Sequence, residues 1–406
     1  MRVMIAGGGT GGHLFPGLAV AEEFKSRDAS TEVIFVGTES GIEARIVPRE
    51  GHPIRFLRAE GLVGVTFIKK IKAIIKAFFS MIDSYRIIQT VRPDIVIGVG
   101  GYASGAVMLL AYLMSIPTMI LEQNSVPGLT NKILGKLVNT VCITYQESIS
   151  FFPKAKTFLT GNPVRVHIFK GNAETGYRLF SLEKGLFTVF AFGGSSGARS
   201  INRSLAEALH YLQDLKGKIQ FLHQTGEKDY ENIRNAYRES GFQGTIAPFV
   251  YQMGEAYAVA DLVISRAGAT TLAELTALGK PAILIPYPFA AGNHQELNAR
   301  KLQEIGAAKM ILDRDLRGET LAGRIKDLFI NETMRQEMQK NSRSVGRPDA
   351  CTKVVDIAMS LIKQSSASGA RSAAGSRGTD NVGEIPGYTL CGDRWYRHVR
   401  DCRGSA

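Results

Sequence analysis

The sequence predicts an α/β fold of two similar domains, each a doubly wound parallel sheet covered by helices. The chain has 406 residues, which is more than one hydrophobic core usually serves. Apolar runs that stop at glycine or polar residues alternate with amphipathic segments, a pattern typical of parallel sheets with helices on both faces. A strand, a glycine loop and a helix occur in that order twice, starting at residues 3 and 187. We therefore expect two Rossmann-like domains that face a central cleft.

The first domain is expected to span residues 1–162. It opens with the apolar run Val3–Ala6, which a glycine loop and a helix near Pro16–Ser26 follow. The same alternation predicts further strands at residues 32–36, 94–98, 118–121 and 140–143. Glycine, asparagine and proline follow one another within Leu159–Arg165 and end regular structure, so we place the interdomain linker there.

The second domain is expected to span residues 163–345. Its strands are predicted at residues 187–192, 219–222, 262–264 and 281–285. Residues 346–363 are expected to form a C-terminal helix that packs back toward the first domain. Composition then shifts to serine, alanine, glycine and arginine, so residues 364–406 are expected to be a disordered tail.

Composition and charge narrow the function classes. Apolar residues make up 45% of the chain and charged residues 21%, as in ordinary globular proteins. We expect neither a signal peptide nor a transmembrane helix, and the four cysteines fit a reducing, cytoplasmic compartment. The formal net charge of +12 indicates an anionic partner. Because no nucleic-acid-binding motif accompanies the charge, an anionic membrane with a diphosphate substrate is a better fit than nucleic acid.

The first glycine loop, residues 7–13, predicts a phosphate site. Glycines let backbone N–H groups and a helix N-terminus approach an anion closely. His13 ends the loop, and its ordinary pKa suits a general base near neutral pH, although a histidine that only bonds its own loop is the alternative. Gly7, Gly9 and Gly12 with Glu39 also match a dinucleotide fingerprint, so an NAD(P)-dependent oxidoreductase stays open.

Other polar or glycine-rich turns follow predicted strands, where parallel sheets bind ligands. Glu122 and Asn124 follow one such strand, and Ser195 lies in a second-domain glycine loop that could hold a diphosphate. Glu274 lies in the first turns of a predicted helix, where it could bind a ribose or simply complement the helix dipole. The remaining turns of this kind are residues 98–105, 265–273 and 293–298.

The segment from Phe67 to Ile88 has a different character. Its apolar residues follow helical spacing, and Lys69, Lys72 and Lys76 form a separate stripe. Such a helix is often packed on a core with its lysines in solvent, but a basic amphipathic segment also binds anionic lipid surfaces. We expect this segment to contact the membrane.

Taken in order, these motifs resemble the bacterial glycosyltransferases that form lipid II. The resemblance rests on residues 8–13, 98–105, 122–124, 161–165, 193–199 and 268–274, and it covers residues 1 to about 360. It implies a GT-B fold and an inverting transfer of GlcNAc from UDP-GlcNAc to the muramyl 4-hydroxyl of undecaprenyl-pyrophosphoryl-MurNAc-pentapeptide, lipid I. It also implies a peripheral enzyme on the cytoplasmic face of the bacterial membrane, with no cofactor and no metal, which could meet other cell-wall synthesis proteins.

Individual roles follow from the same resemblance. His13 corresponds to the candidate base, with Glu122 as the alternative. Val250 falls at the uracil-reading backbone position, and Glu274 matches the ribose-binding acid. The positions implied to contact UDP-GlcNAc are Thr10, Gly11, Gly12, Asn124, Arg165, Ser195, Val250, Ala269, Thr270, Thr271, Leu272, Glu274 and Gln295. The positions implied to hold the acceptor pyrophosphate are Gly9, Gly11, Gly12, Gly100, Gly101 and Tyr102.

Two features depart from the family pattern. His294 precedes Gln295, so the neighbouring sugar contact can differ in detail, and no function transfers to the tail. The hypotheses that compete with this interpretation are another GT-B enzyme, such as a sugar-nucleotide epimerase or a lipid glucosyltransferase, the NAD(P)-dependent oxidoreductase, and a non-catalytic membrane scaffold.

Overall fold

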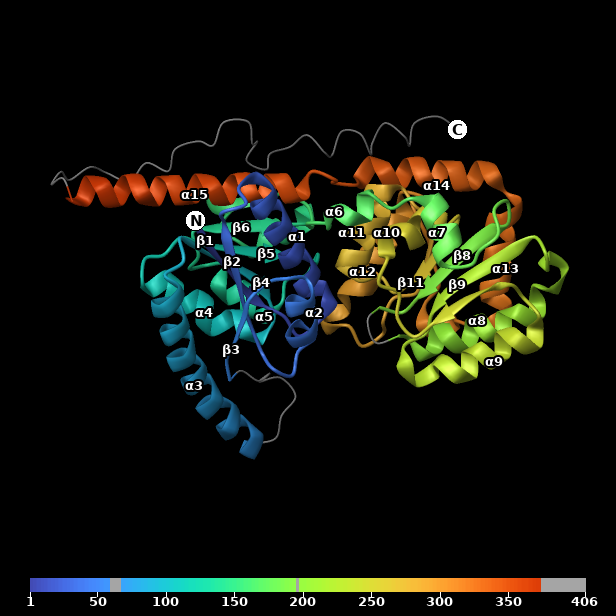
Figure 1. Ribbon diagram of the computed structural model, residues 1–406, viewed down its shortest axis with the longest axis horizontal. Coiled ribbons are helices and arrows are strands. Elements are labelled where there is room, and N and C mark those ends of the chain that lie inside the picture. Colours follow the sequence, from blue (N-terminus) through green and yellow to red (C-terminus); the bar gives the residue numbers. More distant parts are fainter. Residues whose placement is uncertain (59–66, 195–196, 374–406) are drawn as a thin grey trace.

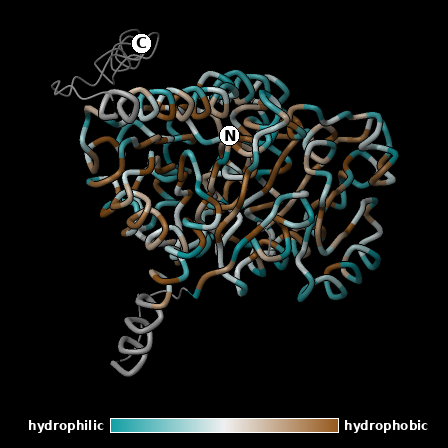
Figure 2. The backbone as a smooth tube through the Cα atoms, turned by 60° about the vertical axis from the view of Figure 1, so that its left-hand side comes forward, coloured by the Kyte–Doolittle hydropathy of each residue, from teal (hydrophilic) through white to brown (hydrophobic). Residues whose placement is uncertain are grey.

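The computed structural model describes residues 1–58, 67–194 and 197–373, which form two halves side by side (Figure 1). Each half is built on one parallel sheet, with helices on both faces. The arrangement confirms the predicted α/β class with two doubly wound domains. Figure 2 shows hydrophobic chain concentrated in the interior of each half, as expected for strands buried on both faces.

The first sheet has seven strands in the order β3-β2-β1-β4-β5-β6-β7. Strand order reverses between β1 and β4, and ligands bind at such switch points in open parallel sheets. The strands are β1 (Arg2–Gly7), β2 (Glu32–Gly37), β3 (Ile54–Phe56), β4 (Ile95–Gly100), β5 (Thr118–Glu122), β6 (Thr140–Ile143) and β7 (Thr157–Leu159). The helices are α1 (Gly11–Arg27), α2 (Glu43–Arg49), α3 (Phe67–Val91), α4 (Tyr102–Leu113), α5 (Leu129–Leu134), η1 (Gln146–Phe151) and η2 (Lys154–Lys156).

Side-chain alternation along β1 assigns its residues to two cores. Val3 and Ile5 pack with α1 on one face of the sheet. Met4 and Ala6 point the other way and pack with α4. All four side chains are fully buried, so β1 anchors the glycine loop that follows it.

The second sheet has six strands in the order β10-β9-β8-β11-β12-β13. The strands are β8 (Phe187–Phe192), β9 (Ile219–Gln224), β10 (Gly244–Ala247), β11 (Leu262–Ser265), β12 (Ala282–Leu284) and β13 (Lys309–Met310). The α-helices up to α14 are α6 (Val166–Phe169), α7 (Ala173–Leu179), α8 (Arg199–Tyr211), α9 (Tyr230–Ser240), α10 (Met253–Val259), α11 (Ala269–Leu278), α12 (His294–Glu304), α13 (Gly318–Ile330) and α14 (Glu332–Val345). Short 3₁₀ turns are η3 (Gln213–Leu215), η4 (Glu227–Asp229), η5 (Ala291–Asn293) and η6 (Asp313–Asp315).

The last helix, α15 (Ala350–Ala373), lies along the first half, where it contacts α1 (Figure 1). Val354 and Ile357 join the core beneath α1, and Arg27 pairs with Asp356 at 2.6 Å.

Two predicted boundaries need correction. Gly346 ends α14, so the helix expected over 346–363 begins at 350. It continues to 373, because the glutamine, serines and alanines after residue 363 tolerate helix, and residues 374–406 lie outside the described structure.

Three smaller expectations also change. Leu159 ends strand β7, so the chain crosses between halves only from Thr160 onward. The first helix begins at Gly11 and carries Pro16 inside it. The apolar residues predicted to share one face of the helix over 67–88 do not share one environment. Tyr85 is half exposed, whereas Ile88 is buried in the core of the first half. The remaining side chains of that prediction up to residue 78, the three lysines included, lie outside the described residues.

Candidate active site

Two glycine turns of the first half meet backbone to backbone at the sheet's switch point. Gly7 ends β1 with a φ of 143°, and a Cβ there would lie 2.4 Å from the carbonyl oxygen of Gly100. Gly101 has a φ of 83°, and its Cβ would lie 2.6 Å from the oxygen of Gly8. Only glycine permits this conformation together with such close packing. The two turns therefore form a single rigid floor at the carboxyl ends of β1 and β4.

The buried carboxylate of Glu43 holds the first of these turns in place. One oxygen accepts the backbone N–H of Gly9 at 2.7 Å, and the other accepts the N–H and hydroxyl of Thr38 at 2.9 and 3.0 Å. A Cβ on Gly8 or Gly41 would collide with this carboxylate. The N–H of Gly9, predicted to meet the acceptor pyrophosphate, is therefore already engaged. Glu43 belongs to no motif recognised in the sequence.

His13 lies in the first turn of α1 with its ring against the second glycine turn. Its Nδ1 is 3.3 Å from the hydroxyl oxygen of Thr10, and a Cβ on Gly100 would lie 2.8 Å from its Cδ2. Burial lowers the pKa of His13 and His294 lowers it further, against a backbone bond to Gly8 and the charge of Glu43. The ring is therefore unprotonated at neutral pH, the form that can accept a proton.

Glu122, the alternative base, ends β5 and is buried. Its oxygens accept the backbone N–H groups of Asn124 at 2.9 Å and Gly128 at 3.3 Å, and the Nδ2 of Asn131 at 2.9 Å. Burial raises the pKa of Glu122, and these donors oppose the rise. The carboxylate thus organises the loop after β5. Asn124, in that loop, is positioned by the hydrogen bond from its backbone N–H to Glu122.

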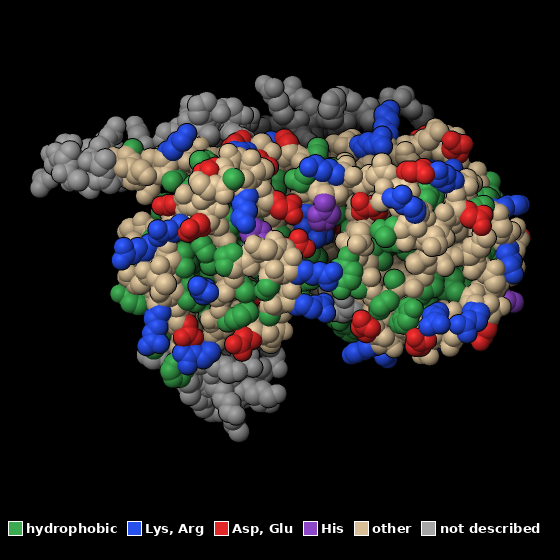
Figure 3. All heavy atoms as spheres, viewed as in Figure 1, with side chains coloured by type: hydrophobic (Ala, Val, Ile, Leu, Met, Phe, Trp, Pro, Cys, Tyr) green, Lys and Arg blue, Asp and Glu red, His purple; other side chains and the backbone are tan. Residues whose placement is uncertain are grey.

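A cavity of about 700 Å³ lies between the two halves. Figure 3 shows lysine and arginine side chains along the groove between them. The first half lines the cavity with the start of α1 and with α2, and the second with the loops after β8, β10 and β11. The predicted donor residues that line it are Thr10, Gly11, Gly12, Arg165, Val250, Thr270, Thr271, Glu274 and Gln295.

Glu274 is the ionisable centre of the second-half wall. It is buried, its Oε2 accepts the hydroxyl of Tyr257 at 2.8 Å, and its Oε1 lies 3.8 Å from the guanidinium of Arg165. Arg165 also stacks 4.1 Å above the ring of Phe15. Burial raises the pKa of Glu274, while Arg165 and Tyr257 oppose that rise. Arg165 therefore favours the carboxylate form, which accepts hydrogen bonds from hydroxyl groups.

The N-terminus of α11 opens into the same cavity. Gly268 precedes its first residue, and Thr270 donates its hydroxyl to the carbonyl of Gly12 across the cleft at 3.2 Å. Free N–H groups and the positive end of a helix dipole favour an anion there. Val250 also lines this cavity, and its backbone N–H donates to the side-chain oxygen of Gln224. Gln295, another lining residue, accepts the N–H of Tyr287 at 2.9 Å.

Several predicted residues do not line this cavity. Ala269 and Leu272 lie on α11 but are buried and do not line it. Ser195 lies outside the described residues. The others that the structure describes without placing them in the lining are Gly9, His13, Gly100, Gly101, Tyr102, Glu122 and Asn124.

Sequence reasoning missed some of the walls. Arg49 of α2 stacks on the ring of Tyr251 at 3.9 Å and so joins the two halves across the cleft. Arg266, which lies in the predicted turn 265–273 but was given no role there, is fixed by Asp313 at 2.5 Å and by the hydroxyl of Ser200 at 2.8 Å. The aromatic residues on either side of Val250 could have indicated the part of the wall that contains Tyr251. No sequence pattern near Arg49 indicates that it lines the cavity. Within the described residues no group of three acidic, histidine or cysteine side chains could hold a metal ion.

Both halves of the chain match domains of one known protein family. The N-terminal domain of glycosyltransferase family 28 matches residues 3–143, and its C-terminal domain matches residues 188–354. A relative from Thermodesulfovibrio yellowstonii is 52% identical over 90% of this chain and 100% of its own length. One from Myxococcus xanthus is 47% identical over 90% of this chain and 94% of its own length. Both are named UDP-N-acetylglucosamine–N-acetylmuramyl-(pentapeptide) pyrophosphoryl-undecaprenol N-acetylglucosamine transferase.

Solved structures agree with this placement. The crystal structure of MurG from Acinetobacter baumannii superposes with a TM-score of 0.67 and 30% identity, over 88% of this chain and 98% of that one. The UDP-GlcNAc 2-epimerase of Neisseria meningitidis, bound to UDP-GlcNAc, superposes with a TM-score of 0.63 over 89% of this chain and 100% of its own. Its identity is 12%, so this likeness concerns the fold alone.

Proposed function

The chain belongs to the UDP-N-acetylglucosamine–N-acetylmuramyl-(pentapeptide) pyrophosphoryl-undecaprenol N-acetylglucosamine transferases, which have the GT-B fold, and we propose how its cleft performs that transfer. The protein is an inverting glycosyltransferase that moves GlcNAc from UDP-GlcNAc to lipid I to give lipid II. The observation that carries the proposal is the cavity in which Thr10 of one half and Arg165 and Glu274 of the other line the same space.

The second half holds the donor. Glu274 accepts hydrogen bonds from the ribose hydroxyls, and Arg165 beside it favours the charged form against the opposing effect of burial. Val250 reads the uracil through its backbone, and Gln295 contacts the sugar. The diphosphate lies at the N-terminus of α11, where Ala269, Thr270, Thr271 and Leu272 begin the helix. Thr10, Gly11, Gly12, Asn124 and Ser195 complete the donor contacts.

The first half holds the acceptor and supplies the base. The pyrophosphate of lipid I lies against Gly11, Gly12, Gly100, Gly101 and Tyr102, and also against Gly9, which contributes close approach and no N–H because Glu43 accepts that hydrogen bond. His13 accepts the proton of the muramyl 4-hydroxyl as the oxygen attacks the anomeric carbon, and the bond to UDP breaks with inversion. The lowered pKa of His13 favours the form required. Helix α11 and Arg165 stabilise the negative charge on the departing UDP.

Glu122 remains the alternative base, with weaker support. Its oxygens accept hydrogen bonds from Asn124, Gly128 and Asn131, so a proton taken from a substrate would break the order of the loop after β5. His13 has an unprotonated ring and lies directly beside Gly12, which lines the cavity. These facts favour His13.

A membrane surface completes the proposal. Among the described residues no helix has the length and hydrophobicity that crossing a membrane requires. The first half instead exposes Leu113 at the end of α4 and Leu129 and Ile133 on α5, with Lys132 above the ring of Phe151 at 4.6 Å. Apolar side chains flanked by cations suit an anionic lipid surface. We place the enzyme on the cytoplasmic face of the membrane, peripheral to it and accessible to other cell-wall synthesis proteins.

The proposal is tested by product analysis with radiolabelled UDP-GlcNAc and a lipid I analogue. We expect label in a disaccharide lipid that forms in proportion to released UDP. Label recovered in an altered free sugar nucleotide, with none in lipid, would instead indicate an epimerase and contradict the proposal. Tight NADH binding without UDP binding would indicate the oxidoreductase.

A further inference from the structure

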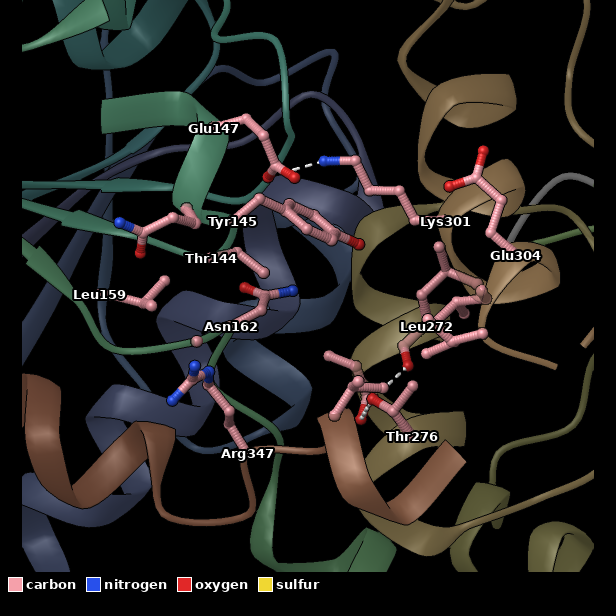
Figure 4. A pocket seen from close by; sticks show the side chains of 16 residues that line it. Thr144, Tyr145, Glu147, Leu159, Asn162, Leu272, Thr276, Lys301, Glu304 and Arg347 are labelled. Carbon is pink, nitrogen blue, oxygen red and sulfur yellow. Dashed lines mark hydrogen bonds and ion pairs between the residues drawn. The ribbon is translucent and has the colours of Figure 1, made fainter. Parts of the chain in front are cut away.

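A second cavity of about 420 Å³ lies between the halves, near the chain's crossings from one to the other (Figure 4). Its lining includes Asn162 from the first crossing and Arg347 from the second. No residue lines both this cavity, which we call the hinge pocket, and the donor cleft. The hinge pocket is therefore a separate space.

The two cavities share their walls. On α11, Thr271 and Glu274 line the donor cleft, whereas Leu272 and Thr276 line the hinge pocket. On the first crossing, Arg165 lines the cleft, and Asn162, three residues earlier, lines the hinge pocket. A molecule in the hinge pocket would thus contact the backs of the segments that carry the proposed ribose acid and its arginine.

Apolar side chains from both halves form most of the hinge pocket's surface. Leu159 contributes from the end of β7, Leu272 from α11, and Leu302 and Ile305 from the last part of α12. Figure 4 shows the ring of Tyr145 along one side. A cavity of this size with apolar walls and few polar groups is typical of small-molecule sites.

One polar group in the hinge pocket has no protein partner. Asn162 is 3% exposed, and both its Nδ2 and its Oδ1 lack a hydrogen-bond partner. Figure 4 shows this amide directed into the cavity between Tyr145 and Leu272. Buried amides are normally satisfied, so this one calls for a ligand group that both donates and accepts.

The charges around the cavity balance. Lys301 is paired with Glu147 across the two halves at 2.7 Å and lies 5.1 Å from the ring of Tyr145. Arg347 and Glu304 add one charge of each sign to the lining. A charged ligand would leave one charge uncompensated, so the lining favours a neutral molecule.

We propose that the hinge pocket binds a small, uncharged amphipathic molecule through a carboxamide bonded to Asn162, and that its occupancy changes the affinity of the donor cleft for UDP. The second clause rests on the proposed function. The coupling arises because α11 and the first crossing are common walls, so any shift that improves the fit on one face displaces the other.

The probe is N-benzylacetamide, which has one apolar ring and one amide. Its saturable binding is measured by calorimetry on the full chain, with and without saturating UDP. We expect Asn162→Leu to weaken the probe at least tenfold, and Ala273→Phe, which fills the pocket from α11, to abolish saturable binding. Glu274→Ala is the matched control on the same helix, expected to lose UDP affinity and keep the probe. Thermal unfolding of each variant checks that it folds.

Absence of saturable probe binding in the unsubstituted chain would overturn the site. The site would also be overturned if the unsubstituted chain and both pocket variants bound the probe with equal affinity. Equal affinity with and without bound UDP would overturn the coupling. Failure of UDP to bind would instead overturn the proposed function, and the probe titrations would still decide the hinge pocket by themselves.

Discussion

Buried carboxylates serve opposite purposes in the two halves of the molecule. In the first half, the carboxylates of Glu43 and Glu122 accept several hydrogen bonds each from backbone N–H, hydroxyl and amide groups of neighbouring loops and helices. In the second half, Glu274 accepts a single protein hydroxyl and faces the cleft beside Arg165. The first half thus uses acids to fix backbone, at Glu43 beside the turn that carries His13, whereas the second leaves its acid facing the cleft, where we propose that it binds the donor. Substitutions in the two halves should therefore affect different kinetic constants.

The largest effect is expected for His13→Ala. Loss of the base should lower kcat by about 100-fold or more, the range for general-base removal, and leave UDP affinity almost unchanged. Steady-state kinetics and UDP titration measure the two. Unchanged turnover would remove His13 from the mechanism and return attention to Glu122.

The pH profile gives an independent check on the same residue. Since the pKa of His13 is lowered from its ordinary value of 6.5, the base stays unprotonated at neutral pH and protonates only in more acidic solution. The acid limb of kcat/KM should therefore have its midpoint below 6.5 and should disappear in His13→Ala. A midpoint above 6.5 would mean that the limb reports another group.

Glu274→Ala should act chiefly on the donor. Removing the ribose contact should raise the KM for UDP-GlcNAc by about 30-fold, about 2 kcal/mol, with a smaller change in kcat at saturating donor. The acceptor KM is the internal control. A change confined to the acceptor would contradict the division of labour between the halves.

These residues also show how far the sequence reached. Strands buried on both faces, such as Val3–Ala6, were predicted because an apolar run between polar stops has few other interpretations. The edge strands Ile54–Phe56, Thr157–Leu159, Gly244–Ala247 and Lys309–Met310 were missed, because strands this short carry no clear period. His13 was found through the glycine motif it ends. Glu43 was not, because only the packing of α2 brings its carboxylate to the first glycine turn.

The missed contacts between halves have the same origin. Arg49 meets Tyr251 only because of how the two domains are oriented, and no local pattern encodes that orientation. Glu39, which the dinucleotide interpretation required, is exposed, and the acid that touches the glycine turn lies four residues later. A sequence indicates which residues follow a strand, but which of them reaches the turn depends on tertiary packing.

Glu43→Gln tests the positioning role. A glutamine keeps the shape but directs an NH₂ group at donors that the carboxylate accepted, so the turn that carries His13 should loosen. We expect kcat to fall about tenfold and the free energy of unfolding to drop by about 1–3 kcal/mol, with little change in donor KM. Glu39→Gln, the exposed neighbour, is the control and should behave like the unsubstituted enzyme. A rise in donor KM alone would mean that Glu43 acts on the donor side.

The smallest effect is expected at the proposed membrane-binding surface of the first half, and it provides a further comparison between the two halves. Leu129 and Ile133 are one helical turn apart on α5, with exposed fractions of 65% and 56%, while Ile330 in the second half is 75% exposed. The double substitution Leu129→Glu and Ile133→Glu should weaken binding to vesicles of anionic phospholipid about fivefold, about 1 kcal/mol, because apolar contact is lost and negative charge is added. Turnover of a water-soluble acceptor analogue should stay unchanged. Ile330→Glu is the matched control, since exposure alone predicts an equal loss there. An equal loss would show that the second half also meets the membrane and that both halves bind lipid.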